Sequence, residues 1–192
     1  SVSVFYDSAI RYTSFVSLGG RNVTSDIAIG LRTSVDQAEK LKIAHGAAIA
    51  SMVDPEEMIT VTAAVGRPDK DVSRNVLASI IEPRMEEIFS LVAREINKAG
   101  MTDMPAAGIV LTGGGALLPG TVELAEQIFD MPVRMGEIKK IEHIPEELDS
   151  ARYITAHGLL HYGFGNEPLT GGKSGTVRGL LKRFENWITR QF

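Results

Sequence analysis

The sequence contains no cysteine, so disulfide bonds and thiolate metal sites are excluded. It also lacks any run of about 20 apolar residues, the length that a transmembrane helix needs. No signal peptide is recognisable at the start, where the first five residues have the pattern of a strand. We therefore expect the chain to begin inside a fold, with further residues before it in the natural protein. The composition of the 192 residues, 44% hydrophobic and 23% charged, is typical of one globular domain or two small subdomains.

Charge is distributed unevenly along the chain. The whole chain has a net charge of −4, whereas residues 173–192 contain five basic residues and one acidic residue, a net charge of +4. Residues 1–172 therefore carry −8. An acidic body with a basic end favours an anionic surface as a partner of that end. Nothing in the body indicates binding to nucleic acid.

The spacing of apolar residues predicts an alternation of strands and helices. The expected elements, in chain order, are a hairpin (2–6 and 10–16), helices (27–31 and 34–50), a strand (58–65), a helical stretch (76–96), a strand (107–112), a helix (118–129), a strand (133–135) and a helix (154–162). This order indicates an α/β fold with a mixed sheet.

Polar residues and one proline suggest where the predicted helices begin and break. The candidate N-caps are Thr24, Ser25 or Asp26 for the first helix, Ser34 for the second, and Asp71 or Ser73 for the third. We expect a break near Pro83, because proline lacks the N–H that a helix interior needs.

A glycine turn is the clearest candidate for a binding element. Residues 109–120 read IVLTGGGALLPG, a buried strand that leads into three glycines and then a helix. Glycines allow close approach of a ligand to the backbone, and a helix N-terminus offers unpaired N–H groups. The segment has neither the Gly-Lys-Ser/Thr ending of a Walker A loop nor the spacing of a Rossmann fingerprint. The alternative is a tight structural turn between strand and helix.

The glycine turn is similar to the adenosine motif of the superfamily of actin, heat-shock chaperones and hexokinase. Residues 38–46, AEKLKIAHG, resemble a helix of bacterial actin-like proteins whose Glu and Lys reach the ribose and base. Residues 19–22 are expected to form a loop, and residues 19–24 resemble the family's loop between hairpin and helix, close to the nucleotide. The resemblance implies an ATP site, and its candidate residues here are Gly20, Asn22, Glu39, Lys42, Gly113, Gly114, Gly115 and Leu117. The alternative for Glu39 and Lys42 is a solvated pair on one helix face.

Four further segments, 23–28, 80–84, 106–114 and 158–163, resemble the FtsA family of bacterial cell-division proteins. The resemblance implies an actin-like, ribonuclease H-like ATPase fold. It divides the chain into subdomain 2A (1–50 and 106–164), subdomain 2B (51–105), a flexible linker (165–175) and an amphipathic membrane-targeting helix (176–192). Both phosphate-binding hairpins of the superfamily are missing. We therefore expect this chain alone to bind Mg-ATP poorly and to hydrolyse nothing; whether the parent is an ATPase stays open.

The same resemblance implies partners and a location. Subdomain 2B of the family receives the acidic and hydrophobic C-terminal peptide of FtsZ, for which Lys70, Arg74 and Arg84 are the candidate contacts. The alternative is that these are ordinary solvated charges. Actin-like filaments, other division proteins and a peripheral place on the cytoplasmic side of the cell membrane, at the septum, are also implied. A type IV pilus adaptor or another actin-like ATPase remains an alternative.

The end of the chain has the pattern of an interfacial helix. Apolar residues follow one stripe at helical spacing, and charged residues lie largely off it. The residues expected to meet the membrane are Leu180, Leu181, Phe184, Trp187, Ile188 and Phe192, with the basic Arg178, Lys182 and Arg183. A helix of this length, about 25 Å, with a charged face lies in an interface and does not cross it. The alternative is packing on its own domain.

Two other patterns carry no predicted chemistry. His157 and His161 have a spacing seen in zinc sites, but no Glu follows His157 and no third ligand is evident. Neither Thr112 nor Ser25 has a His and Asp at a spacing that would justify a catalytic triad. We predict neither a metal site nor a catalytic residue.

Overall fold

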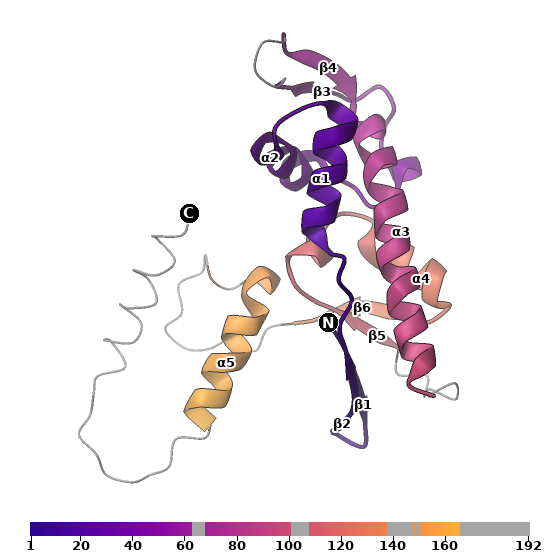
Figure 1. Cartoon of the computed structure of the whole chain (residues 1–192), viewed down its shortest axis with the longest axis vertical. Helices are drawn as coiled ribbons and strands as arrows, with labels where there is room; N and C mark the ends of the chain where they lie inside the picture. Colours follow the sequence, from indigo (N-terminus) through magenta and orange to yellow (C-terminus); the bar gives the residue numbers. More distant parts are fainter. Residues whose placement is uncertain (63–67, 101–107, 138–147, 149, 166–192) are drawn as a thin grey trace, which may run out of the picture. The chain divides into compact units, whose positions relative to one another are not determined.

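The computed structural model describes residues 1–62, 68–100, 108–137, 148 and 150–165 (Figure 1). The chain divides into two compact units, Ser1–His157 and Gly158–Phe192. The predicted helix over residues 176–192 lies outside the described residues, as does the predicted linker after its first residue, Gly165. Among the described helices, none is both long enough and apolar enough to cross a membrane.

The predicted N-terminal hairpin is confirmed. β1 (Val2–Tyr6) pairs antiparallel with β2 (Ala9–Ser14), with a shift of register between Val4 and Phe5. Asp7 and Ser8 form the turn with φ of 50° and 61°. Two successive positive φ values match the right-handed twist of the strands, which is why such two-residue turns connect hairpins.

The first helix begins earlier than the sequence suggested. α1 (Gly20–Leu31) has Gly19 as its N-cap, so none of Thr24, Ser25 and Asp26 caps it. The side chain of Asn22 accepts a hydrogen bond of 3.0 Å from the N–H of Gly19, which stabilises the first turn in place of a capping hydroxyl. The expectation of a loop over residues 19–22 was therefore wrong.

The second helix is capped as predicted but ends sooner. Ser34 accepts the N–H of Gln37 at 3.2 Å and caps α2 (Val35–His45). The chain leaves the helix at Gly46, where a Cβ would lie 2.4 Å from the carbonyl oxygen of Lys42 and 2.8 Å from the side chain of Leu118. A short 3₁₀ helix, η1 (Ala50–Met52), follows.

A strand that the sequence analysis missed follows β3. β3 (Met58–Val61) pairs antiparallel with β4 (Lys70–Ser73). Asp71 lies within β4 and is not a cap. Ser73 accepts the N–H of Asn75 at 3.2 Å and caps the next helix, as the second of the two alternatives predicted.

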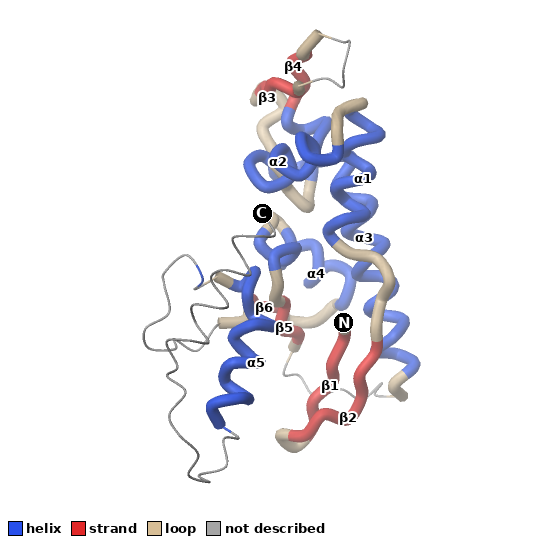
Figure 2. Tube along the Cα trace, turned by 60° about the vertical axis from the view of Figure 1, so that its left-hand side comes forward, coloured by secondary structure: helices blue, strands red, loops and turns tan. Residues whose placement is uncertain are grey.

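α3 (Arg74–Lys98) runs through Pro83 without a break, which contradicts the predicted interruption. Proline in a helix interior costs about 3 kcal/mol. The buried face of α3 contributes more, because each fully buried large apolar side chain is worth about 1.5–3 kcal/mol. Its buried residues are Leu77, Ala78, Ile81, Met85, Phe89 and Ile96. They pack α3 against α1, α4 and β1, so tertiary burial outweighs the local penalty (Figure 2).

The glycine turn lies in a strand–turn–helix unit. β5 (Ile109–Leu111) pairs in parallel with β6 (Val133–Met135), and between them lie the 3₁₀ helix η2 (Gly114–Leu117) and α4 (Thr121–Phe129). The strand before the glycines was predicted, but the prediction that it is buried was wrong, since Val110 is 48% exposed. In place of one mixed sheet, the described residues form three two-stranded sheets.

One hydrophobic core joins these elements. It contains buried residues from β1, α1, α2, β3, α3, α4 and β6. The rings of Phe89 and Phe129 meet edge to face at 5.7 Å and connect α3 to α4. After β6 come η4 (Ala151–Tyr153) and α5 (Ile154–Gly165).

Candidate functional site

The ammonium group of Lys42 connects α2 to the start of α1. It donates to the carbonyl oxygen of Gly20 at 3.1 Å, to Oγ1 of Thr24 at 2.8 Å and to Oε2 of Glu39 at 2.6 Å. Only 12% of the Lys42 side chain is exposed, whereas 44% of the Glu39 side chain is. The predicted pair of Glu39 and Lys42 is therefore an ion pair within one helix, anchored to a second helix by the lysine.

The carboxylate of Glu39 is held in its charged form. Partial burial opposes ionisation, but hydrogen bonds from Lys42 and Thr24 outweigh it and lower the pKa of Glu39. The positive charges of Lys42 and Arg152 act in the same direction. Both named hydrogen bonds go to Oε2, so this oxygen is already occupied.

The glycine turn is open on its outer side. Gly113 has φ +93° and ψ 167°, a conformation that is essentially restricted to glycine. A Cβ added at Gly113 or Gly115 would meet no atom within 4 Å, and Leu117 is 48% exposed. The turn can therefore present its backbone to a ligand without a side chain in the way.

The glycine turn and the segment after α2 are joined at two places. The N–H of Ala48 donates to the carbonyl oxygen of Pro119 at 2.8 Å. At Gly120, with φ +80°, a Cβ would lie 3.4 Å from the backbone nitrogen of Ile49 and 3.3 Å from the sulfur of Met52. This close approach fixes the segment after α2 against the end of the turn.

Arg152 lies beside the other end of the turn. A Cβ on Gly114 would lie 4.0 Å from Cγ of Arg152, and η4, which carries Arg152, packs against η2. The charge of Arg152 also lowers the pKa of Glu39 on α2. Of the residues that the sequence analysis assigned to one site, Gly20, Glu39 and Lys42 are in direct contact.

Sequence reasoning missed two members of this group. Thr24 was interpreted as a possible helix cap and as the last residue of the loop-like segment 19–24, but not as a site residue, and Arg152 was assigned no role. The signal for Thr24 was its spacing, four residues after Gly20, which places its hydroxyl near that carbonyl once the helix begins at Gly20. Asn22, predicted to be near the ligand, instead uses its side-chain oxygen at Gly19.

The three basic residues assigned to peptide binding do not form one cluster. Lys70 is an exposed residue at the start of β4. Arg74 pairs with Glu57 at 2.7 Å and donates to the carbonyl oxygen of His45 at 2.8 Å. Arg84 lies about 15 Å further along α3, since each helical residue adds about 1.5 Å.

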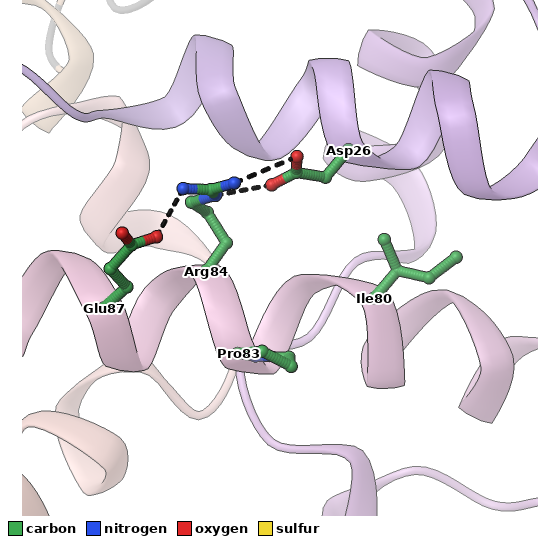
Figure 3. Close-up of a pocket in the computed structure, with 5 residues that line it drawn as sticks. All are labelled: Asp26, Ile80, Pro83, Arg84 and Glu87. Atoms are coloured by element: carbon green, nitrogen blue, oxygen red, sulfur yellow. Dashed lines mark hydrogen bonds and ion pairs between the residues drawn. The ribbon is translucent and has the colours of Figure 1, made fainter.

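Arg84 lines a pocket of about 240 Å³ with Asp26, Ile80, Pro83 and Glu87 (Figure 3). Its guanidinium binds both oxygens of Asp26, at 2.5 and 3.2 Å, and also pairs with Glu87. The hydrogen bonds to Asp26 raise the pKa of Arg84, although burial opposes this. The pocket therefore combines an apolar wall with an arginine that two carboxylates already neutralise.

The two histidines lie in different environments. His157 is buried, and its Nε2 is 2.8 Å from the carbonyl oxygen of Leu148. His161 is exposed on α5. Within the part of the chain that the structure describes, no group of three His, Asp or Glu side chains is placed to hold a metal ion.

Comparison with known proteins gives a consistent family. Residues 1–158 match the family model "Cell division protein FtsA". Over the whole chain, the sequence is 37% identical to the cell division protein FtsA of Pseudomonas aeruginosa, 39% to that of Neisseria meningitidis and 34% to that of Escherichia coli. The chain covers 48% of each, so it spans about half the length of these curated relatives.

Solved structures show the fold. MreB5 of Spiroplasma citri bound to ADP superposes with a TM-score of 0.61 at 16% identity, covering 86% of this chain and 52% of that chain. The AMPPNP-bound protein superposes with a TM-score of 0.52 at 16% identity, covering 89% of this chain and 47% of that one. The predicted actin-like α/β fold agrees with this likeness. Among the actin-like alternatives, the family match selects one: the chain belongs to the FtsA family of cell division proteins.

Proposed function

We propose that the chain supplies the adenosine-binding side of an ATP site in an actin-like cell-division protein. The observation that carries this proposal is the ion pair of Glu39 and Lys42 on α2, which Lys42 anchors to α1. The open glycine turn supports it, because Arg152, which lies beside Gly114, also lowers the pKa of Glu39. A charged acceptor next to accessible backbone suits a ribose and a base better than it suits a phosphate chain. The solved relatives of the same fold were bound to ADP and AMPPNP.

The test compares adenosine with ATP on the chain itself. Adenosine added to the isotope-labelled chain should shift the amide resonances of residues 113–117 and 39–42. ATP should bind no tighter than adenosine, because no residue of this chain is assigned to the phosphates, and no hydrolysis should follow. Tight ATP binding seen by calorimetry would place phosphate contacts in this chain. Unchanged spectra at millimolar adenosine would remove the proposed site.

We further propose that the protein links FtsZ filaments to the cytoplasmic side of the cell membrane at the division septum. In this proposal, residues 51–105 form subdomain 2B and receive the FtsZ C-terminal peptide, while residues 1–50 and 106–164 form subdomain 2A. Residues 165–175 act as a linker to the membrane-targeting segment 176–192. Membership of the FtsA family supports this assignment, together with the basic end of the sequence. Filament formation through the actin-like body, and contacts with other division proteins, belong to the same proposal.

Described side chains of this chain support one part of this proposal, the peptide site. Ile80 and Pro83 offer an apolar wall, and Arg84 offers a cation beside it. An acidic and hydrophobic peptide would pack against the apolar wall and pair with Arg84 in place of Asp26 or Glu87. Pull-down with the FtsZ C-terminal peptide tests the proposal, and a lack of capture by the chain would contradict it.

A further inference from the structure

We propose that Glu82 is a positioning residue that couples the glycine turn to the pocket at Arg84, through a connecting segment formed by residues 46–53. This segment follows α2, contains η1 and has hydrogen bonds both to the end of the turn and to α3. The inference rests on the proposed function only for what binds at its two ends, adenosine at the turn and an acidic peptide at the pocket. The connection itself depends on side chains and backbone of this chain.

On one side, the connecting segment is held by α3. The N–H of Ala50 donates to Oε2 of Glu82 at 3.1 Å, and the carbonyl oxygen of Ala50 accepts from Nδ2 of Asn75 at 2.8 Å. Glu82 and Asn75 are seven residues apart, which is about two helical turns, so they lie on one face of α3. Both backbone groups of Ala50 are therefore satisfied by side chains of another element, a role that backbone partners usually fill.

On the other side, the connecting segment is held by the end of the glycine turn. The N–H of Ala48 donates to the carbonyl oxygen of Pro119 at 2.8 Å. At Gly120, a Cβ would lie 3.4 Å from the backbone nitrogen of Ile49, so the two backbones are in close contact. Ala48 is 0% exposed and Ile49 is 7% exposed, which leaves them no open space to move into. A displacement of the end of the turn therefore moves the connecting segment with it.

Glu82 is the residue at which the connecting segment meets the pocket. The next two residues of α3, Pro83 and Arg84, line that pocket (Figure 3). Because Pro83 has no N–H, the carbonyl oxygen of Ser79 lacks the donor of a regular helix, and proline positions are where helices bend. A movement of Ala50 therefore reaches α3 beside the place where this helix bends most easily, and beside the guanidinium that the peptide would meet.

The first test needs no ligand. Gly120→Ala displaces the end of the turn, because φ at Gly120 is +80° and the added Cβ would press on Ile49. In the otherwise wild-type, isotope-labelled chain, this change should shift the amide resonances of residues 48–50 and 84–87. Together with Glu82→Leu, which has no acceptor oxygen, the shifts should stop at the connecting segment. Together with Glu82→Gln, which keeps an acceptor oxygen, they should reach residues 84–87 again. Equal shifts of residues 84–87 in all three backgrounds would overturn the proposal.

Hydrogen exchange provides a second measurement, which stays decisive if circular dichroism shows that Gly120→Ala does not fold. Exchange of the Ala50 amide should be at least about fivefold faster in Glu82→Leu than in wild type or in Glu82→Gln. The Ala48 amide, which the turn holds, should exchange faster in Glu82→Leu as well. Glu86→Leu is the matched control, since Glu86 is exposed on the same helix, and it should change neither rate. Unchanged exchange of Ala48 in Glu82→Leu would mean that the two contacts are independent, which contradicts the coupling.

A further test measures the coupling between the two ligands. Saturating adenosine should change the affinity of the wild-type chain for the FtsZ C-terminal peptide at least about threefold, and the peptide should change the affinity for adenosine by the same factor. Glu82→Leu should bring both factors close to one, and Glu82→Gln should keep them. A residue that only stabilised the fold would leave these factors unchanged. Equal factors in wild type and in Glu82→Leu would therefore refute the role of Glu82.

Failure of the proposed function and failure of this inference give different results. If adenosine or the peptide does not bind the wild-type chain, the function proposed for that site fails. The shifts caused by Gly120→Ala then still decide whether Glu82 connects the turn to α3. If both ligands bind and Glu82→Leu leaves their coupling intact, the proposed function stands and the role of Glu82 is wrong.

Discussion

The guanidinium of Arg84 on α3 binds both carboxylate oxygens of Asp26 on α1, across 58 residues of sequence (Figure 3). Both side chains are partly exposed, 26% for Arg84 and 28% for Asp26. An exposed pair of this kind contributes about 0.2–1 kcal/mol, because water and salt screen it. The pair is therefore weak enough for an incoming carboxylate to compete with Asp26 for Arg84.

The first prediction concerns this competition. Asp26→Asn should strengthen binding of the FtsZ C-terminal peptide, by up to about fivefold, because it releases Arg84 from an interaction worth at most about 1 kcal/mol. Arg84→Glu should weaken binding at least about tenfold, since a like charge then faces the acidic peptide. Fluorescence anisotropy with a labelled peptide measures both affinities.

Glu86→Gln is the matched control, because Glu86 is exposed on the same helix and has no hydrogen bond to Arg84. Like Asp26→Asn, it removes one negative charge, and it should leave the affinity for the peptide nearly unchanged. If Asp26→Asn lowers the affinity, Asp26 itself contacts the peptide. If Arg84→Glu has no effect, Arg84 does not belong to the peptide site.

The second prediction concerns Glu95, which joins the N-terminal hairpin to α3. Its carboxylate accepts from Lys98 at 2.6 Å, from Ser14 at 2.5 Å and from Tyr12 at 3.1 Å. The hydrogen bond from Lys98, followed by that from Ser14, lowers the pKa of Glu95 to about 2. A pKa lowered on folding stabilises the folded state above the unfolded pKa, and this stabilisation is lost as the pH falls through the folded pKa.

The free energy of unfolding of wild type should therefore exceed that of Glu95→Gln at neutral pH, and the difference should shrink between about pH 4.5 and pH 2. Urea denaturation at a series of pH values measures it. Glu86→Gln, which removes a carboxylate without these partners, should show no such pH-dependent difference. A difference for Glu95→Gln that stays constant down to pH 2 would contradict the assigned hydrogen bonds.

The third prediction concerns two neighbouring glycines. Gly113→Ala should destabilise the chain by about 1–3 kcal/mol, because its φ of +93° and ψ of 167° are strained for any residue with a Cβ. Gly115→Ala should change stability by no more than about 0.5 kcal/mol, since its φ is ordinary and a Cβ there meets no atom within 4 Å. Thermal and urea unfolding compare the two. Equal effects would mean that the turn adopts another conformation in solution.

Much of the local structure could be predicted from the sequence because it depends on local rules. The Asp7 and Ser8 turn between alternating strands predicted the hairpin. Ser34 and Ser73 are caps that hydrogen-bond to N–H groups within three residues of them. These features involve neighbours in sequence, so a pattern in the sequence contains the necessary information.

The features that could not be predicted depend on distant partners. Pro83 stays within α3 because the helix buries its face against α1 and α4. Thr24 belongs to the candidate site because Glu39 and Lys42, on another helix, lie against it. Arg84 is neutralised by Asp26, and nothing in the sequence pairs these two residues. Tertiary packing decides each case, and a single sequence does not reveal it.

The fourth prediction concerns the basic end of the chain, residues 176–192. The wild-type chain should float with liposomes that contain anionic lipid, and a chain that ends at residue 175 should not. The apolar stripe supplies burial in the interface, and each basic residue adds about 1 kcal/mol near an anionic surface.

Lys182→Gln together with Arg183→Gln should therefore weaken binding to anionic liposomes roughly 30-fold. Binding to uncharged liposomes should respond little to these two changes. Trp187→Ser should weaken binding to both kinds of liposome, because it removes apolar contact and no charge. Equal recovery of the full and shortened chains would show that residues 176–192 do not carry the chain to a membrane, and would favour the alternative that this segment packs on protein.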